Sequence, residues 1–226
     1  MAKVNFIPFE INTGIENMRI DEDILNQAIT SNCSIPTFRL YGWKPACISL
    51  GRNQRKDFLD EELLTSMNID VVTRLTGGRA LLHDKEITYS FVCHQDFLRN
   101  GGSVTESYKE ISQILVSIFD KMGIILNLGG ENVHTRHDYC MLVSTGAYLN
   151  FEGKKLVGSA QVRKKGYILQ HGSILYDYDK NLLEQVFKEP VSIDKITTIK
   201  EVFGCSQCEF LEKFNEIFPS VFQRLF

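Results

Sequence analysis

The amino-acid sequence predicts an α+β fold in which a mixed β-sheet is layered with helices. Two long segments carry apolar residues at helical spacing, before and between short runs rich in β-branched and aromatic residues. Of the 226 residues, 43% are hydrophobic and 23% are charged, an ordinary globular composition. Helices and half-buried strands in one chain pack as layers around a common core. We therefore expect a single domain over residues 1–226, with residues 181–226 forming a helical C-terminal segment.

The first helix is expected to begin at Thr13, because Thr13 and Glu16 have the spacing of a capping box. The apolar residues that follow fall on one helical face. They are Ile15, Met18, Leu25, Ala28 and Ile29.

Residues 37–94 are expected to be mainly strands, because their apolar runs are short and rich in β-branched and aromatic side chains. The predicted strands are 38–43, 46–51, 71–75, 80–82 and 87–93. One short helix, at about 57–67, interrupts them.

A second long helix is predicted over residues 104–122. Ser103 and Glu106 have capping-box spacing at its start, and Gly123 stands where a helix commonly ends. Further strands are predicted at 124–128, 146–151, 155–162 and 167–176, with hairpin turns at 152–153 and 165–166. Pro219 is expected at the first position of a helix in the C-terminal segment.

Charge and composition exclude several classes of function. The net charge of −3 gives no basic surplus for nucleic-acid binding. No apolar stretch approaches the roughly 18 residues needed to cross a bilayer, and the N-terminus lacks the pattern of a signal peptide. Six cysteines without such a signal suggest reduced thiols. We therefore expect a cytoplasmic protein that binds neither nucleic acid nor membrane.

The densest candidate for a binding site is the segment 74–84, Arg-Leu-Thr-Gly-Gly-Arg-Ala-Leu-Leu-His-Asp. Gly77 and Gly78 let the backbone approach a ligand without a Cβ in the way. Arg74 and Arg79 offer planar donors for phosphate, carboxylate or carbonyl oxygen, and His83 adds a further polar group. The alternative is a tight turn with two surface arginines, and the glycine pair alone does not decide between them.

A second candidate is the segment 155–162 paired with 167–175. Gly158, Ser159 and Ala160 offer a stretch almost without side-chain bulk, over which a narrow apolar slot for an acyl chain can fit. The alternative is a small-residue seam packed under a helix. Gln161 is a polar candidate at the mouth of the slot. His171, followed by Gly172, also fits the pattern of an ordinary structural histidine.

The chain resembles the lipoate/biotin ligase and octanoyltransferase superfamily, and within it the LipM-type octanoyl-[acyl carrier protein]:protein octanoyltransferases. The resemblance covers residues 15–180, in the order and at the spacing of that family. It is carried by residues 17–22 (Asn-Met-Arg-Ile-Asp-Glu), 41–46 (Tyr-Gly-Trp-Lys-Pro-Ala), 49–51, 54, 74–84, 88–90, 155–161 and 169–175. It implies a biotin/lipoate ligase-like catalytic fold.

The resemblance also implies a reaction and its residues. A catalytic cysteine is expected 15 positions before the lysine of the Lys-x-x-Gly-Ser-Ala segment, which makes Cys140 the nucleophile and Lys155 its partner. The donor is expected to be octanoyl-acyl carrier protein and the acceptor a lipoyl-domain protein such as the glycine cleavage H protein, with no cofactor and no metal. The expected substrate-binding residues are Arg74, Gly77, Gly78, Arg79, His83, Gly158, Ser159, Ala160, Gln161, His171 and Gly172. After Cys140, the segment 141–145 (Met-Leu-Val-Ser-Thr) departs from the family pattern, in which an aromatic residue and then Pro-Ser usually follow.

Other cysteines and other functions compete with this interpretation. Cys205 and Cys208 form a single CxxC pair, whereas a structural zinc site normally needs four ligands. His137, three positions before Cys140, invites a Cys–His dyad. The nearest functional alternative is an ATP-dependent lipoate–protein ligase, although the chain is too short for the full accessory domain that many such ligases carry. An octanoyl amidotransferase between lipoyl-domain proteins and a non-catalytic acyl- or carrier-binding module are further alternatives.

Overall fold

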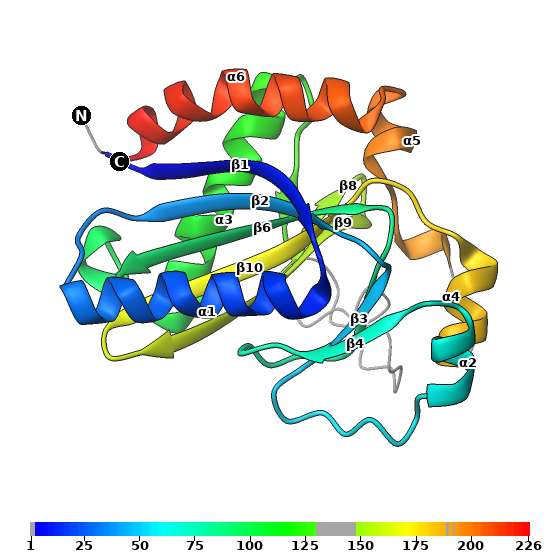
Figure 1. Ribbon diagram of the computed structural model, residues 1–226. Coiled ribbons are helices and arrows are strands. Elements are labelled where there is room, and N and C mark those ends of the chain that lie inside the picture. Colours follow the sequence, from blue (N-terminus) through cyan, green and yellow to red (C-terminus); the bar gives the residue numbers. More distant parts are fainter. Residues whose placement is uncertain (1–2, 130–147, 189, 192) are drawn as a thin grey trace.

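The computed structural model describes residues 3–129, 148–188, 190–191 and 193–226. Their main feature is a seven-stranded sheet with the strand order β1-β2-β6-β10-β9-β8-β7 (Figure 1). β1 runs parallel to β2, and the other neighbouring strands are antiparallel. The strands are β1 (Asn5–Asn12), β2 (Thr37–Trp43), β6 (Glu86–His94), β7 (Asn127–Leu128), β8 (Tyr148–Phe151), β9 (Lys154–Lys164) and β10 (Tyr167–Leu175).

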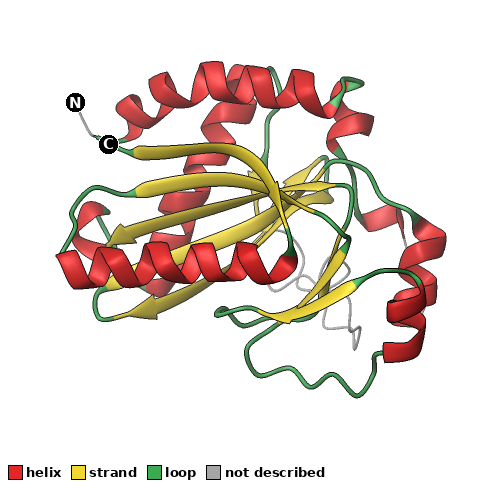
Figure 2. Cartoon of the chain, in the orientation of Figure 1, coloured by secondary structure: helices red, strands yellow, loops and turns green. Residues whose placement is uncertain are grey.

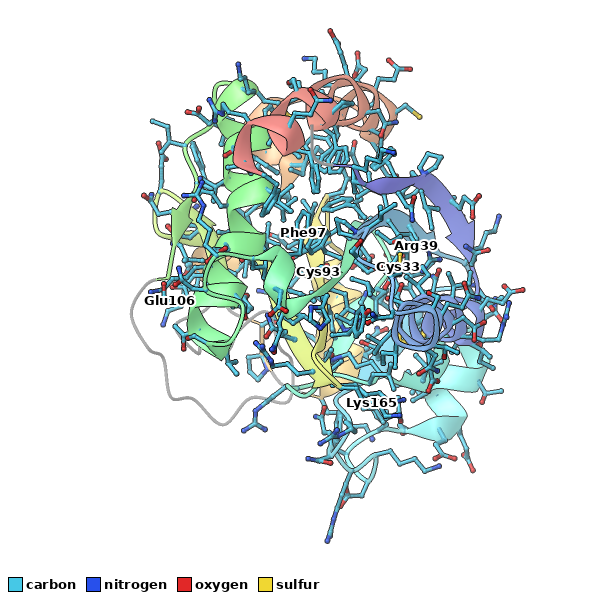
Figure 3. The ribbon with its side chains drawn as sticks, turned by 90° about the vertical axis from the view of Figure 1, so that its left-hand side faces the viewer. Cys33, Arg39, Cys93, Phe97, Glu106 and Lys165 are labelled. Atoms are coloured by element: carbon cyan, nitrogen blue, oxygen red, sulfur yellow. The ribbon has the colours of Figure 1, made fainter. Side chains whose placement is uncertain are left out.

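Helices cover both faces of this sheet. α1 (Gly14–Ser31) lies on one face, and α3 (Val104–Lys121) and α6 (Gln207–Leu225) lie on the other (Figures 1 and 3). Figure 3 shows Arg39 close to α1, with Cys93 and Phe97 on the side of α3 and α6. No helix in the described part of the chain is long and apolar enough to cross a membrane.

A second, three-stranded sheet lies beside the larger one (Figure 2). It has the order β4-β3-β5, formed by β3 (Cys47–Leu50), β4 (Asp70–Thr73) and β5 (Leu81–His83). The short helices α2 (Glu61–Ser66) and α4 (Lys180–Phe187) pack against it through a core of their own that includes Ile48, Leu64 and Leu183.

The strands at the centre of the large sheet alternate between an apolar and a polar face. In β6, Ile87, Tyr89 and Phe91 belong to the core under α3 and α6. Thr88 and Ser90 point to the opposite face, where Ser90 donates a hydrogen bond to Asp21 of α1. Successive side chains of a strand point to opposite faces of the sheet. The polar face of the sheet is therefore the one shared by α1 and the small sheet.

The capping residues expected for the two long helices are confirmed. Thr13 and Glu16 form both hydrogen bonds of a capping box at the start of α1. Ser103 caps α3, and Gly123 follows its end with a positive φ of 87°. The strand β1 was absent from the sequence prediction. Pro8 interrupts its apolar run, and none of its residues is fully buried.

The expectation for Pro219 was wrong. Pro219 lies inside α6, not at its first position. The helix begins after Ser206, which forms a capping box with Glu209. Four buried phenylalanines recur at four-residue spacing on both sides of the proline. Burial of each contributes about 1.5–3 kcal/mol. Together they offset the roughly 3 kcal/mol that a proline inside a helix costs. They are Phe210, Phe214, Phe218 and Phe222.

The remaining C-terminal segment is helical as expected, but interrupted. α4 is followed by the 3₁₀ turn Ile193–Lys195, by α5 (Ile199–Phe203) and by α6. Gly204 ends α5 in a left-handed conformation and so separates it from α6.

Candidate active site

The glycine-pair loop, residues 74–80, crosses the polar face of the large sheet. Thr76 is fully buried, and its hydroxyl shares a hydrogen bond of 2.7 Å with Nε2 of His171 in β10. Leu75 packs with Leu169 of β10 against α1. The loop is therefore anchored on the centre of the sheet, and Gly77 and Gly78 follow directly after the anchor.

Arg74 gives the glycine-pair loop its shape. Arg74 is only 7% exposed, and its guanidinium donates to the carbonyl oxygens of Gly77 and Arg79, both at 2.8 Å. It also donates to the carbonyl oxygen and hydroxyl of Ser49 in β3. A planar guanidinium with several fixed donors suits this task, since it can hold several acceptors at once. Sequence reasoning assigned Arg74 to substrate, and that role stays a prediction.

The two glycines meet different surroundings. Gly78 has a φ of 97°, which an L side chain rarely adopts. The Cβ of an alanine at Gly51 would lie 2.0 Å from the carbonyl oxygen of Gly78, so the loop and the end of β3 are in close contact. A Cβ at Gly77 would meet no atom of the described residues within 4 Å. Gly77 therefore presents open backbone, as a wall of a binding slot requires.

His83 lies in a buried cluster at the end of β5. Its Nε2 lies 2.8 Å from the hydroxyl of Ser49, and its Nδ1 lies 3.1 Å from Oε1 of Glu86. Its ring stacks on Trp43 with centroids 3.9 Å apart. Burial lowers the pKa of His83 below its ordinary value, although the Glu86 carboxylate acts in the opposite direction. His83 is therefore a neutral imidazole near pH 7, and it does not point away from the fold as an exposed binding group would.

His171 is held in a similar way on β10. Nε2 meets Thr76, and Nδ1 lies 3.3 Å from Oδ2 of Asp21 in α1. Asp21 is 2% exposed and also accepts from Arg39 at 2.9 Å and from the hydroxyl of Tyr41 at 2.8 Å. Burial acts to raise the pKa of Asp21, but the partners His171, Arg39 and Tyr41 outweigh it and lower that pKa. Asp21 is therefore a buried carboxylate that stays ionised.

Two chains of hydrogen bonds therefore start at Arg74. Each passes through a hydroxyl group and a histidine to a carboxylate. In one chain, Arg74 donates to the hydroxyl of Thr76, which leads through His171 to Asp21. In the other chain, Arg74 donates to Ser49, which leads through His83 to Glu86. A neutral histidine donates from one ring nitrogen and accepts at the other. Both chains hold their histidine between a hydroxyl and a carboxylate and brace the glycine-pair loop.

The small residues of β9 divide between the two faces of the sheet. Ala160 pairs with His171, and Gly158 pairs with Ser173, so both face the glycine-pair loop. Ser159 faces the other way, with its hydroxyl 2.9 Å from that of Tyr89. Because side chains alternate along β9, only every second residue of the segment that was expected to line the slot faces the glycine-pair loop.

Gln161 and Gly172 also lie on the α3 face. Gln161 contacts Ser107 of α3 at 3.3 Å and Gln170 at 3.1 Å. A Cβ at Gly172 would lie 2.3 Å from the hydroxyl of Ser159, so this glycine permits close packing between β9 and β10. Of the expected substrate-binding residues, the structure groups Gly77, Gly78, Gly158, Ala160 and His171 on one face. Direct roles for Ser159, Gln161 and Gly172 stay predictions that this placement does not favour.

Lys155 lies on the same face as Gly158. The lysine is 5% exposed, and its Nζ lies 5.5 Å from the ring centre of Tyr148, the β8 residue that pairs with Gly158. A register shift in β8 between Leu149 and Asn150 interrupts the regular alternation beside it. A lysine this deeply buried is uncommon and points to a functional role.

The expected nucleophile Cys140 lies outside the described residues, as do His137 and the segment 141–145. Among the described cysteines, Cys47 and Cys93 are buried thiols whose pKa burial raises, in Cys93 to about 12. A thiol is a poor nucleophile at such a pKa. Cys205 and Cys208 lie at the start of α6, and the described residues contain no group of three potential metal-binding side chains around them or elsewhere.

Sequence reasoning missed the buried partners of the site. Asp21 and Ser49 lie in segments that carry the family resemblance, but they were given no role, and Glu86 lies outside those segments. Thr76 was passed over between the arginine and the glycines. A signal was present in the alternation of β6, where Glu86, Thr88 and Ser90 recur at every second position. It indicates a polar strand face, but not which groups lie opposite.

Comparison with known proteins gives several relatives. The chain is 41% identical to the Octanoyltransferase LipM of Kyrpidia tusciae over 77% of this chain and 66% of that protein. It is 37% identical to the one of Brevibacillus brevis over 97% of this chain and 87% of that protein. The match covers 65% of the Octanoyltransferase LipM of Clostridioides difficile. The chain therefore spans about two-thirds of the length of several of these relatives.

Two solved structures share the fold. A lipoate-protein ligase A bound with ATP has a TM-score of 0.76 at 20% identity, over 98% of this chain and 86% of that one. The putative lipoate protein ligase Ta0514 of T. acidophilum, with bound lipoic acid, has a TM-score of 0.74 at 19% identity, over 98% and 86%. The family described as the lipoyl protein ligase A/B catalytic domain matches residues 13–222. A match of this extent, together with these relatives, shows that the chain belongs to the lipoyl protein ligase A/B catalytic domain family.

Proposed function

We propose that the protein transfers an octanoyl group from acyl carrier protein to a lysine of a lipoyl-domain protein, such as the glycine cleavage H protein, through a thioester on Cys140. The proposal is supported by relatives named Octanoyltransferase LipM at 36–41% identity. The observation that carries it is the buried Lys155 beside Gly158, on the face covered by the glycine-pair loop. A cytoplasmic location is part of the same proposal.

The first half-reaction forms the acyl-enzyme. The Cys140 thiolate attacks the carbonyl carbon of the carrier thioester, a new C–S bond forms, and the carrier thiolate leaves and takes a proton. In the second half-reaction, the acceptor lysine attacks as a neutral amine. The C–N bond forms, the bond to Cys140 breaks, and the departing thiolate or a nearby base accepts the amine proton. Thioester and amide formation balance without nucleotide or metal.

Lys155 needs more than one task in this scheme. A thiol of pKa about 8.5 is only about 3% thiolate at pH 7. If a nearby ammonium lowers that pKa to about 7, the thiolate fraction rises roughly sixteenfold, but the weaker nucleophile returns a factor of about 4–6. The net gain is about threefold. Stabilising the tetrahedral oxyanion is worth about 3–4 kcal/mol, so we assign Lys155 mainly to the oxyanion.

The acyl chain is expected to lie between the backbone at Gly77 and the small residues Gly158 and Ala160. Each buried methylene contributes about 0.8 kcal/mol, so an eight-carbon chain supplies several kcal/mol of binding without a nucleotide. Among the described residues, the backbone of Gly77 is best suited to form a wall of such a slot, because a Cβ there would meet no atom within 4 Å.

The overall reaction is tested with purified octanoyl-carrier protein, an unmodified lipoyl domain and no ATP. We expect the lipoyl domain to gain the mass of one octanoyl group, with no exchange of labelled pyrophosphate into ATP when octanoate or lipoate is supplied. Pyrophosphate exchange that persists in a Cys140→Ser variant would establish an ATP-dependent ligase in its place. Transfer from an octanoylated lipoyl domain alone, and not from the carrier, would establish an amidotransferase.

A further inference from the structure

Positively charged residues lie on the glycine-pair loop and on the connecting loop next to it. The loop that joins β3 to α2 carries Arg52, Arg55 and Lys56, and all three are exposed. Arg79, next to Gly78, is exposed as well. In Figure 1 this connecting loop runs along the lower edge of the molecule, on the side away from α6. We call these four residues the basic rim.

The basic rim is fixed to the site by the backbone. The amide of Arg52 donates a hydrogen bond of 2.9 Å to the carbonyl oxygen of Thr76. Next to it, Gly51 is in such close contact with Gly78 that a Cβ would lie 2.0 Å from the Gly78 carbonyl oxygen. The rim therefore lies directly beside the backbone that presents Gly77.

The local charge differs from that of the chain. The whole chain has a net charge of −3, whereas residues 51–57 carry three cations and one anion, Asp57, and Arg79 adds a fourth cation. Lys56 forms an exposed ion pair of 2.6 Å with Glu61. Within the part of the chain that the structure describes, no ion pair is recorded for Arg52 or Arg55. Clustered charges of one sign beside a site attract a partner of the opposite sign and raise its rate of association.

We propose that the basic rim is the docking surface for the acyl donor, a carrier protein that presents an acidic surface next to its acyl-bearing arm. The inference rests on the proposed octanoyl transfer and deepens it by assigning a surface to one of its two protein substrates. Guanidinium groups bind carboxylates and phosphates through paired hydrogen bonds, which suits both an acidic helix and a phosphate-linked arm.

Charge also separates the donor from the acceptor. The acceptor brings a lysine ammonium, which the guanidinium groups of Arg52, Arg55 and Arg79 repel. The donor brings a neutral thioester, and a phosphate on its arm is attracted. The rim therefore favours the donor.

The experiment uses the full chain and the double variant Arg52→Glu/Arg55→Glu. Formation of the acyl-enzyme is measured with octanoyl-carrier protein, with octanoyl-phosphopantetheine and with octanoyl-pantetheine, which lacks both carrier and phosphate. Transfer from preformed acyl-enzyme to the lipoyl domain is measured separately. Lys213→Glu/Arg224→Glu on α6, away from the rim, is the matched double charge-reversal control, and Arg52→Lys/Arg55→Lys keeps the charge. Thermal unfolding checks that each variant is folded.

We expect kcat/KM with octanoyl-carrier protein to fall by about tenfold or more in the double charge reversal, within the range attributed to electrostatic steering. The rate with octanoyl-pantetheine should change by less than about twofold. Transfer to the lipoyl domain should stay the same or rise, because the variant no longer repels the acceptor lysine. Raising the salt concentration should lower the wild-type rate towards that of the variant, and the lysine variant should keep most of it.

Other outcomes would overturn the docking surface. An equal loss with all three donors would mean damage to the site, a loss confined to the second half-reaction would assign the rim to the acceptor, and an unchanged rate would leave the rim without a role. Wild-type protein that forms no acyl-enzyme with any donor would refute the proposed transfer itself and, with it, the donor surface. That result is recognisable without any variant.

Discussion

The hydroxyl of Thr76 and the imidazole of His171 share a hydrogen bond of 2.7 Å, although 95 positions separate them in the sequence. This bond joins the glycine-pair loop to the central strand β10. The same hydroxyl accepts from Nε of Arg74 at 3.2 Å, and His171 in turn meets Asp21. The position of the loop over the sheet therefore depends on a buried polar chain that begins at Arg74 and ends in α1.

Replacing Thr76 by Val should disrupt this chain. Valine has nearly the same shape but leaves Nε2 of His171 and Nε of Arg74 without the hydroxyl, and an unsatisfied buried group costs about 1–3 kcal/mol. We expect the free energy of unfolding to fall by that amount and octanoyl transfer to fall with it. Thr73→Val, at an exposed position of β4, is the control and should change stability by less than about 0.5 kcal/mol. Denaturant titration that finds the two variants equally stable would show that the bond contributes nothing.

Gly77→Ala tests whether the open backbone is a wall of the acyl slot. The new methyl group would meet no described atom within 4 Å, so the variant should fold with unchanged stability. In the complex, the same methyl group would displace the acyl chain, and a displacement of about 1 Å can cost about 10²-fold in rate. We expect kcat/KM for the octanoyl donor to fall by about 10- to 100-fold, with a smaller loss for a shorter acyl chain. Full activity in a stably folded variant would place the acyl chain elsewhere.

Lys155→Ala should slow octanoyl transfer by about 10²–10⁴-fold, the usual effect of removing a positioned oxyanion or proton-transfer group. Its neighbour Lys154 is exposed, so Lys154→Ala is the matched control and should keep nearly full activity. Raising the pH by two units should restore only part of the activity of Lys155→Ala, because thiol ionisation accounts for only about threefold of the effect. Complete recovery at high pH would assign Lys155 to thiol ionisation alone.

The buried His83 should make stability depend on pH. Its pKa in the folded protein lies below the ordinary value of 6.5, mainly because of burial. As the pH falls below about 6.5, the unfolded chain takes up a proton that folded His83 does not, so the free energy of unfolding falls until the pH passes the lower, folded pKa. His83→Gln lacks this contribution. We therefore expect the advantage of wild type over His83→Gln to shrink between pH 7.5 and pH 5.5 in denaturant titrations, and a constant difference would contradict the assignment.

Much of the fold followed from local sequence patterns. Thr13 and Glu16 mark the start of α1, and Ser103 and Gly123 bound α3, because capping residues and the apolar period lie within a few positions of one another. Pro219 shows where local rules fail. A stripe of buried phenylalanines along α6 outweighs the preference of a proline for the start of a helix, and only the packed structure reveals that stripe.

The site was only partly predictable for a similar reason. The glycine pair and Lys155 stand in short motifs, whereas Asp21, Ser49 and Glu86 reach the histidines through contacts between distant segments. Sequence spacing also suggested that residues 158–161 act together. Strand alternation sends Ser159 and Gln161 to the other face of the sheet.

The proposed octanoyl transfer depends most on Cys140, which would hold the acyl group as a thioester. Wild-type protein incubated with octanoyl-carrier protein and no ATP should gain the mass of one octanoyl group, and hydroxylamine should release it. Digestion should map the group to the peptide that contains Cys140, and Cys140→Ser should not form the hydroxylamine-labile adduct. Cys208→Ser, which removes an exposed thiol, is the control and should be acylated as wild type is. An adduct on another cysteine, or acylation that requires ATP, would contradict the account.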